Sequence, residues 1–280
     1  MEVKRNYLLN RFFSRNTIRN LLKNNHDLIF NEILESTQYE YRSNLETIQN
    51  CYIQLDKTYR NEYFYKNTLL NKLLLGVHSI NTTTALTEIP LGSAKPDFVL
   101  INGKAVVYEI KTELDNFDRI ENQIREYYKA FDHVSILTHE KNIDIAKAKI
   151  ANLSKPIGLY ILQKNNKIKT ILKPQEYKND LDIDVIFKIL RKNEYENIIL
   201  KYFKELPKVS QFEYYDECKK IIKSIPLELM YKDFLVELKK RSQINKVEFE
   251  KVPKELRFLV YFMDFKQKDY HQLNDFLYKK

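Results

Sequence analysis

The sequence is poor in cysteine and glycine, contains no tryptophan, and has no long apolar run. Its two cysteines, Cys51 and Cys218, lie far apart and have no CxxC or Cys/His spacing, which excludes a disulfide framework and a zinc site of ordinary form. Both are expected to be buried, inert thiols. No apolar stretch approaches the roughly 18 residues that a membrane helix needs. We therefore expect a soluble, globular protein that makes no contact with a membrane.

The N-terminus also lacks the features of a secretion signal. Residues 1–13 carry positive charges, but they contain no uninterrupted apolar segment and no small-residue cleavage site. The sequence therefore predicts a cytoplasmic location.

The charge of the chain is strongly positive. It has 47 Lys and Arg against 38 Asp and Glu, a formal net charge of +9. Each phosphate that a basic side chain neutralises releases a condensed counterion, so this excess favours contact with polyanions such as nucleic acids. Basic residues gather in the first twenty residues and in the C-terminal third: Lys4, Arg5, Arg11, Arg15, Arg19, Lys219-Lys220, Lys239-Lys240-Arg241 and Lys279-Lys280. The alternative for each run is an ordinary solvated helix face.

Apolar spacing divides the chain into three parts. Residues 1–57 are polar with short apolar clusters and predict an N-terminal helical region, whereas residues 58–174 alternate helical and strand patterns and predict the core. Beyond Pro174 only helical patterns recur, so residues 175–280 are expected to form a C-terminal helical domain. Its helices are expected over 185–206, 213–223, 227–241 and 254–265.

The central part predicts a mixed sheet. Its elements are, in order, a helix over 59–75, strands over 82–91, 97–101 and 105–112, an amphipathic helix over 116–132, and a strand over 133–139. A short helix over 143–151 and strands over 157–163 and 167–172 follow. The expected fold class is therefore α+β: a mixed central sheet with an α-β-β-β-α-β core, flanked by N- and C-terminal helical regions.

Two acids and a lysine interrupt the apolar strands on one side. Strand side chains alternate, so Glu109 and Lys111 project from one face of their strand, while Val106, Tyr108 and Ile110 project from the other into a core. If Asp97 faces the same way, two carboxylates and the Ile110 backbone carbonyl can converge on a hard divalent cation such as Mg²⁺, which prefers oxygen ligands. Lys111 would then position an attacking water or stabilise negative charge developing on a phosphodiester.

The turn between the two strands decides whether these side chains share a face. Asn102-Gly103 predicts a tight hairpin. A two-residue loop would pair Asp97 with Tyr108 and put Glu109 on the opposite face. A three-residue loop ending at the glycine would pair Asp97 with Val107 and bring both acids to one face. A metal site needs both acids on one face. We therefore predict an odd loop or a bulge at this turn.

Pro96-Asp97 followed by Glu109-Ile110-Lys111, within this order of elements, resembles the PD-(D/E)XK, or restriction-endonuclease-like, nuclease superfamily. The resemblance covers about residues 59–138. It implies a metal ion held by Asp97, Glu109 and the Ile110 carbonyl, and a catalytic role for Lys111. The ion would be Mg²⁺, with Mn²⁺ able to substitute. The reaction implied is phosphodiester hydrolysis, of DNA more than of RNA.

Two further features extend the resemblance. Gln123 and Tyr127, one turn apart on the helix after the lysine strand, resemble the QxxxY element of RecB-like and Cas4-like nucleases, which implies a place near the site and contact with substrate. Glu62, on the helix before the strands, resembles the additional metal-binding glutamate of some members. The chain lacks the GxxxxE motif and the cysteines of an iron–sulfur cluster, so neither exonuclease action nor a cluster is implied.

Each of these residues also has a purely structural interpretation. Asp97 can be an ordinary strand-entry residue, and Glu109 with Lys111 can be an exposed charge pair that contributes little. The QxxxY pair can be a surface amide and an aromatic at the edge of the core. Glu62 can simply form an ion pair with Lys66 one helical turn on.

The expected function is that of a metal-dependent nuclease, a phosphodiester hydrolase with nucleic acid as its partner, DNA more than RNA. The residues are compatible with endonuclease or exonuclease action. Cleavage of both strands would favour a homodimer, because one site cuts one strand. The main alternative is a catalytically silent module of the same fold that binds nucleic acid or a protein partner. In a further alternative, the C-terminal helical domain of a phage or mobile-element protein binds such a partner.

Overall fold

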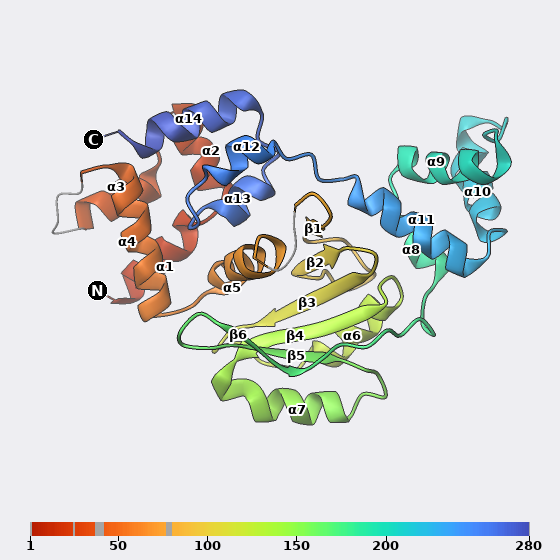
Figure 1. The fold of residues 1–280 in the computed structure, drawn as a ribbon, viewed down its shortest axis with the longest axis horizontal. Coiled ribbons are helices and arrows are strands. Elements are labelled where there is room, and N and C mark those ends of the chain that lie inside the picture. The colour runs from red at the N-terminus through yellow and green to blue at the C-terminus, as the bar shows by residue number, and fades with distance from the viewer. Residues whose placement is uncertain (1, 25, 37–41, 77–79, 280) are drawn as a thin grey trace. The chain divides into compact units, whose positions relative to one another are not determined.

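The computed structural model describes residues 2–24, 26–36, 42–76 and 80–279. Helices and one six-stranded mixed sheet give it the α+β fold class expected from the sequence (Figure 1). The predicted order of one helix, three strands, a helix and a strand runs from α5 to β4. Within this described part of the chain, no helix is long and apolar enough to cross a membrane.

The chain groups into two compact units. The first, called the helical unit here, joins Met1–Ile80 with Gln243–Lys280, and the second, the sheet unit, is Asn81–Ser242. The ranges predicted from the sequence, 1–57, 58–174 and 175–280, follow the order of the chain. The packing instead returns the last three helices to the first five, because they bury their apolar faces there.

The described residues of the helical unit contain helices and no strands. They are α1 (Glu2–Phe12), α2 (Arg15–Asn24), α3 (Leu28–Ser36), α4 (Asn44–Lys57), α5 (Glu62–Leu69), the π-helical turn η1 (Leu70–Leu74), α12 (Lys246–Glu250), α13 (Arg257–Tyr261) and α14 (Gln267–Leu277). The helix predicted over 59–75 begins at Glu62, because the Asn61 side chain caps it by accepting from the Phe64 N–H at 3.0 Å. The helix predicted over 254–265 is limited to α13.

Buried polar side chains join the two ends of the chain within the helical unit. Asn67 is 1% exposed, and its amide donates to the Lys254 carbonyl at 2.9 Å and accepts from the Phe258 N–H at 3.0 Å. Tyr63 donates its hydroxyl proton to the Glu255 carbonyl. These bonds satisfy backbone groups that burial would otherwise leave without partners.

The sheet unit is built on strands that follow one another in space as they do in sequence. The strand order is β1-β2-β3-β4-β5-β6 (Figure 1). The strands are β1 (Thr84–Leu86), β2 (Phe98–Ile101), β3 (Ala105–Lys111), β4 (His133–His139), β5 (Gly158–Leu162) and β6 (Ile168–Leu172). The first three are antiparallel, β3, β4 and β5 are parallel, and β6 is antiparallel to β5.

Two helices supply the crossovers between the parallel strands. They are α6 (Ile120–Tyr128) and α7 (Ile143–Ala151), the second preceded by the short turn η2 (Glu140–Asn142). Ile124 and Tyr128 of α6 and Ala146 of α7 belong to one buried cluster with Val107 and Ile136 of the sheet. The same cluster includes Ala105 and Val107 of β3, whose side chains alternate to the same side as those of Glu109 and Lys111, so α6 covers that face.

The strand predicted over 82–91 is shorter than expected. It ends at Leu86, and Glu88 then takes a positive φ of 55°. Leu91 instead pairs with Ala94 in an isolated bridge, and both are buried. A left-handed turn in a non-glycine residue interrupts the extended chain, which apolar alternation alone does not reveal.

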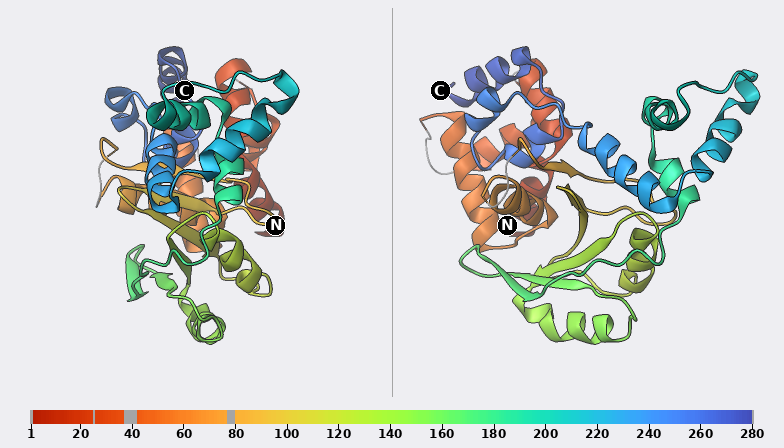
Figure 2. Two further views of the ribbon diagram at one scale, coloured as in Figure 1. Left: turned by 90° about the vertical axis from the view of Figure 1, so that its right-hand side faces the viewer. Right: turned by 45° about the vertical axis from the view of Figure 1, so that its right-hand side comes forward.

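Four helices complete the sheet unit (Figure 2): α8 (Ile183–Ile189), α9 (Lys192–Phe203), α10 (Gln211–Lys223) and α11 (Leu227–Lys239). The single helix predicted over 185–206 is therefore two helices. Leu190 and Arg191 are extended between them, with ψ of 137° and 162°. Buried side chains of these helices, among them Phe187 and Phe234, share one core with the sheet.

Both cysteines are buried and free, as predicted. Burial raises the pKa of the Cys51 thiol to about 12, and it also raises the pKa of Cys218. Because the thiolate is the reactive form, both side chains are expected to be unreactive at neutral pH.

Candidate active site

The β2–β3 hairpin sets the geometry of the predicted site. Its register pairs Ile101 with Ala105, which leaves a loop over 102–104. Gly103, in the middle of that loop, has φ of +73°, a conformation that favours glycine. Continued to the residue before β2, the same register sets Asp97 opposite Glu109.

The prediction of an odd loop at this hairpin is confirmed, but the loop begins one residue later than expected. The predicted register paired Asp97 with Val107, whereas the observed one pairs Val99 with Val107. Ile101 is only 1% exposed, so burial keeps it in the strand and lengthens the hairpin by one pair. The parity is the same in both registers, and Asp97, Glu109 and Lys111 share one face.

Asp97 is held against the neighbouring strand. It is half-buried just before β2, and its Oδ2 accepts a hydrogen bond from the Ile110 N–H at 2.8 Å. The aspartate carboxylate therefore lies at the backbone N–H of Ile110, the residue whose carbonyl is the third ligand predicted from the sequence.

Glu109 is the centre of a buried polar cluster. It is 2% exposed, and its Oε1 accepts from Gln123 Nε2 at 2.6 Å and lies 3.0 Å from Lys111 Nζ. Gln123 Oε1 accepts in turn from Lys111 Nζ at 3.1 Å. The interpretation of Glu109 and Lys111 as an exposed charge pair is therefore wrong, since both side chains are largely shielded from solvent.

Tyr127 completes the cluster from α6. Its ring is fully buried, and its hydroxyl donates its one proton to Glu109 Oε2 at 2.5 Å, with the Lys95 carbonyl also nearby at 3.1 Å. Burial, followed by the negative charges of Glu109 and Asp97, raises the pKa of Tyr127 far above its ordinary value. The hydroxyl thus stays a proton donor at neutral and alkaline pH.

The QxxxY pair therefore contacts the predicted metal-binding glutamate directly. Gln123 and Tyr127 lie at i and i+4, so both point from one face of α6 toward the end of β3. Their contact with substrate remains a prediction.

The end of β3 is braced by residues that the sequence did not single out. Thr138 on β4 donates its hydroxyl proton to the Lys111 carbonyl at 2.7 Å, and Asn142 donates to the Thr112 carbonyl at 2.9 Å. Asp115 accepts from the Thr112 N–H at 2.8 Å. The contact between Thr112 and Asp115 spans three residues, so a local sequence pattern could have predicted it. The contacts of Thr138 and Asn142 join distant parts of the chain, and no local pattern predicts them.

Glu62 belongs to the helical unit. It lies in the first turn of α5, its side chain is 59% exposed, and it forms an ion pair with the buried Lys66. The i, i+4 pair considered from the sequence is therefore confirmed. A role for Glu62 as a metal ligand remains a prediction.

The donor set around Asp97 and Glu109 fits a hard divalent cation. Among the described residues, no three or more His, Cys, Asp and Glu side chains are grouped to hold a metal ion. The predicted set needs only two carboxylates and the Ile110 carbonyl, all of them the oxygen donors that Mg²⁺ prefers. Within the described chain, Glu109 Oε2 accepts one hydrogen bond, from Tyr127, and its second lone pair is available to a cation.

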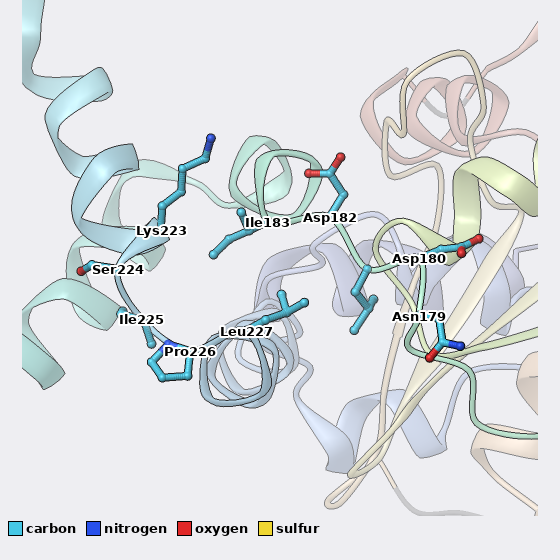
Figure 3. Close-up of a pocket in the computed structure, with 10 residues that line it drawn as sticks. Asn179, Asp180, Asp182, Ile183, Lys223, Ser224, Ile225, Pro226 and Leu227 are labelled. Carbon is cyan, nitrogen blue, oxygen red and sulfur yellow. The ribbon is translucent and has the colours of Figure 1, made fainter.

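A cavity of about 640 Å³ lies elsewhere in the sheet unit, lined by residues 179–183 and 223–227. Figure 3 shows Ile183 and Leu227 lying toward its middle, while the carboxylates of Asp180 and Asp182 point away from it. Asp182 accepts from the N–H groups of the first turn of α8. This cavity shares no residue with the Asp97–Glu109–Lys111 site and has no convergent acids.

Three comparisons with known proteins bear on the chain as a whole. No curated protein matches it. A protein of unknown function from Silicibacter pomeroyi is a structural match with 14% sequence identity and a TM-score of 0.29, covering 46% of this chain and 87% of that one. The family described as bacteriophage P4 protein cII matches residues 55–257, which include the whole sheet unit and every predicted site residue. This match indicates a phage or mobile-element context. The chain belongs to the bacteriophage P4 protein cII family.

Proposed function

We propose that this protein is a metal-dependent nuclease that hydrolyses phosphodiester bonds, with DNA preferred over RNA. The observation that carries the proposal is the register of β2 and β3, which sets Asp97 opposite Glu109 with Lys111 on the same face. A net charge of +9 supports a polyanionic substrate. Membership in a bacteriophage family is compatible with action on the nucleic acid of a phage or its host.

In this proposal, three groups of the protein would bind the metal ion. Asp97, Glu109 and the Ile110 carbonyl would hold Mg²⁺ or Mn²⁺. When bound, such an ion polarises a phosphate oxygen and lowers the pKa of a coordinated water. Glu109 is already oriented by Gln123 and Tyr127, so little reorganisation is needed to bind the ion.

Lys111 supplies the positive charge. Its Nζ lies beside Glu109 Oε1 and Gln123 Oε1, which fix it next to the Glu109 carboxylate. There it stabilises negative charge on the non-bridging phosphate oxygens. In the reaction, the oxygen of water forms a new P–O bond, one ester P–O bond breaks, and the departing oxygen takes up a proton. No oxidant or other co-reactant is needed.

Cleavage by the full chain tests the proposal. Linear and circular, single- and double-stranded DNA and RNA are incubated with Mg²⁺, Mn²⁺ or excess EDTA. We expect DNA to be cut with either metal and to stay intact in EDTA, and we expect calorimetry to detect binding of the ion. Cleavage of circles would identify an endonuclease, and a dimer on sizing would accompany cutting of both strands. An inert protein that binds no divalent ion would overturn the proposal.

A catalytically silent binding module is the second candidate. It is favoured by the Glu109 carboxylate, because both of its oxygens already bond protein groups, as those of a structural carboxylate would. A protein partner is supported by exposed apolar side chains on α9 and α10, among them Phe203 at 45% and Phe212 at 99% exposure. Such a module would bind nucleic acid or protein in the assay above without cutting.

The Tyr127 hydroxyl provides a test of the support around Glu109. Tyr127→Phe keeps the buried ring but removes the donor to Glu109 Oε2. We expect metal affinity or cleavage rate to fall about 10- to 100-fold, as is usual when a group that orients a metal ligand is removed. Calorimetry with Mn²⁺ and initial cleavage rates measure the two quantities.

The adjacent tyrosine is a matched control. Tyr128 is equally buried, but its hydroxyl donates to the Pro156 carbonyl at 3.1 Å and does not touch the site. Tyr128→Phe should lower stability to a similar extent and leave metal binding and cleavage unchanged. Equal loss of activity in both variants would mean that Tyr127 acts only through general stability.

A further inference from the structure

The turn between α1 and α2 gives the helical unit a helix–turn–helix arrangement. α1 ends at Phe12 and α2 begins at Arg15. Ser14 starts the second helix, because its Oγ accepts from the Thr17 N–H at 3.3 Å and its carbonyl accepts from the Ile18 N–H at 3.2 Å. Thr17 also donates its hydroxyl proton to the Arg11 carbonyl at 3.0 Å, which ties the start of α2 to the end of α1.

The two faces of α2 differ sharply. Thr17, Ile18 and Leu21 are buried, and the helix packs on α1 and α14 of the same unit (Figure 1). The opposite face is exposed and carries a stripe at three- and four-residue spacing, named the α2 stripe here: Asn16, Arg19, Asn20 and Lys23.

The α2 stripe is cationic and amide-bearing, and the one carboxylate described as touching it is the buried Asp27. The helix contains no Asp or Glu, whereas α4 and α14 of the same unit mix acids with bases. No carboxylate of the described residues pairs with Arg19 or Lys23. Asn20 donates to Asp27 Oδ2 at 2.9 Å, so the orientation of its amide is fixed. An ordinary solvated face carries charges of both signs, and this one does not.

The basic residues of the N-terminal region have different surroundings in the structure. The Arg15 guanidinium lies 6.0 Å from the Phe262 ring centre, and Arg11 donates to the Tyr7 hydroxyl at 2.7 Å while remaining exposed at the end of α1. Arg19 stands on the α2 stripe. The side chain of Lys4 lies outside the described residues.

We propose that α2 is a DNA-contacting helix that places the α2 stripe in the major groove of duplex DNA. An α-helix is about 10–12 Å across, and the major groove of B-DNA is about 12 Å wide. Arginine and asparagine bond the edges of guanine and adenine, and lysine bonds phosphate. The deep, narrow major groove of A-form RNA does not admit a helix, so the occupant is duplex DNA. Arg11, at the end of the first helix, faces the phosphate backbone in this arrangement.

Binding without metal tests this inference independently of cleavage. Fluorescence anisotropy of a labelled DNA duplex is measured in EDTA with the full chain and with Arg19→Gln/Lys23→Gln, over a range of salt concentrations. We expect the slope of log Kobs against log salt to fall by about 0.9 through the lost Lys23 phosphate contact, and loss of the Arg19 base contact to weaken binding further. Affinity at physiological salt should fall about tenfold or more. Circular dichroism verifies that the fold is retained.

A charge-matched variant and an RNA duplex provide the controls. Lys57→Gln/Lys246→Gln removes the same two charges from other exposed positions of the helical unit and should leave the slope nearly unchanged. An RNA duplex of the same sequence should bind more weakly than the DNA. An equal loss in both double variants, or equal binding of the two duplexes, would show general charge attraction and overturn the proposal. Failure of the nuclease assay would leave this result untouched.

Discussion

Glu109→Gln is expected to lower the rate of DNA cleavage by about 10³-fold. The substitution keeps the size and shape of the buried side chain but removes the negative charge that would hold the metal ion. A metal ion contributes several kcal/mol to stabilising the transition state, and each ~1.4 kcal/mol is a factor of ten in rate. Initial rates with Mg²⁺, together with calorimetric titration of Mn²⁺, measure the loss.

Further variants separate loss of the ion from loss of the fold. Asp97→Asn should lose both metal binding and cleavage, whereas Lys111→Met should bind the ion and still fail to cut. Glu121→Gln makes the same chemical change on the outer part of α6, where the carboxylate pairs at 3.8 Å with Lys149, and should retain activity. Should Glu109→Gln remain active while Asp97→Asn is inactive, Glu109 would have the structural role described for the silent module.

The second large effect concerns stability of the helices beside the sheet. Arg241 donates to both oxygens of Glu194, at 2.7 and 2.6 Å, and to the Ile189 carbonyl at 2.7 Å. Both charged side chains are nearly buried, at 11% and 5% exposure. Arg241→Met leaves the Glu194 charge buried without its partner, so we expect a loss of about 3–5 kcal/mol in the free energy of unfolding.

Urea unfolding and hydrogen exchange measure this effect. Exchange should accelerate in α8, α9 and α11, which the Arg241 bonds join. The exposed pair between Lys208 and Glu205 is the matched control, with the lysine 88% exposed, and Lys208→Met should change stability by less than about 1 kcal/mol. A shift as small for Arg241→Met would contradict the prediction.

The same pair predicts a dependence of stability on acid pH. Burial, the largest influence, would raise the pKa of Glu194, but the Arg241 hydrogen bonds and the Arg191 N–H outweigh it and hold the pKa below its usual value of 4.5. The folded protein therefore binds this proton less readily than the unfolded chain does. The contribution is present above pH 4.5 and is lost as pH falls through the lowered pKa. In Arg241→Met the burial of Glu194 is no longer outweighed, so its pKa should rise and this part of the curve of stability against pH should reverse its slope.

Local patterns predicted the elements around the site because short-range forces determine them. The apolar spacing of α6 and the Asn102-Gly103 turn both act within a few residues, and each element was found close to its predicted place. Alternation put Glu109 and Lys111 on one face, but it left two hairpin registers open for Asp97, and the structure selects the odd loop that brings Asp97 to the same face.

The neighbours of Glu109 were only partly predictable. Helical spacing puts Gln123 and Tyr127 on one face of α6, but nothing in the sequence states that this face meets the Glu109 carboxylate. The same holds for Thr138, which reaches the Lys111 carbonyl from the adjacent parallel strand. Such contacts depend on strand register and on the position of the helix. Both are determined by the surface that distant segments bury against each other.

By itself, the sequence determined the fold class, the order of strands and helices from β1 to β6, and the common face of Glu109 and Lys111. These follow from side-chain periodicity and turn chemistry, which are local properties of the chain. Tertiary structure alone decided that Asp97 stands opposite Glu109, and that the final helices join the first five. Burial of Ile101 extended the hairpin, and buried bonds such as those of Asn67 drew the chain ends together. These contacts join residues that are far apart in sequence, so local sequence patterns cannot predict their free energy.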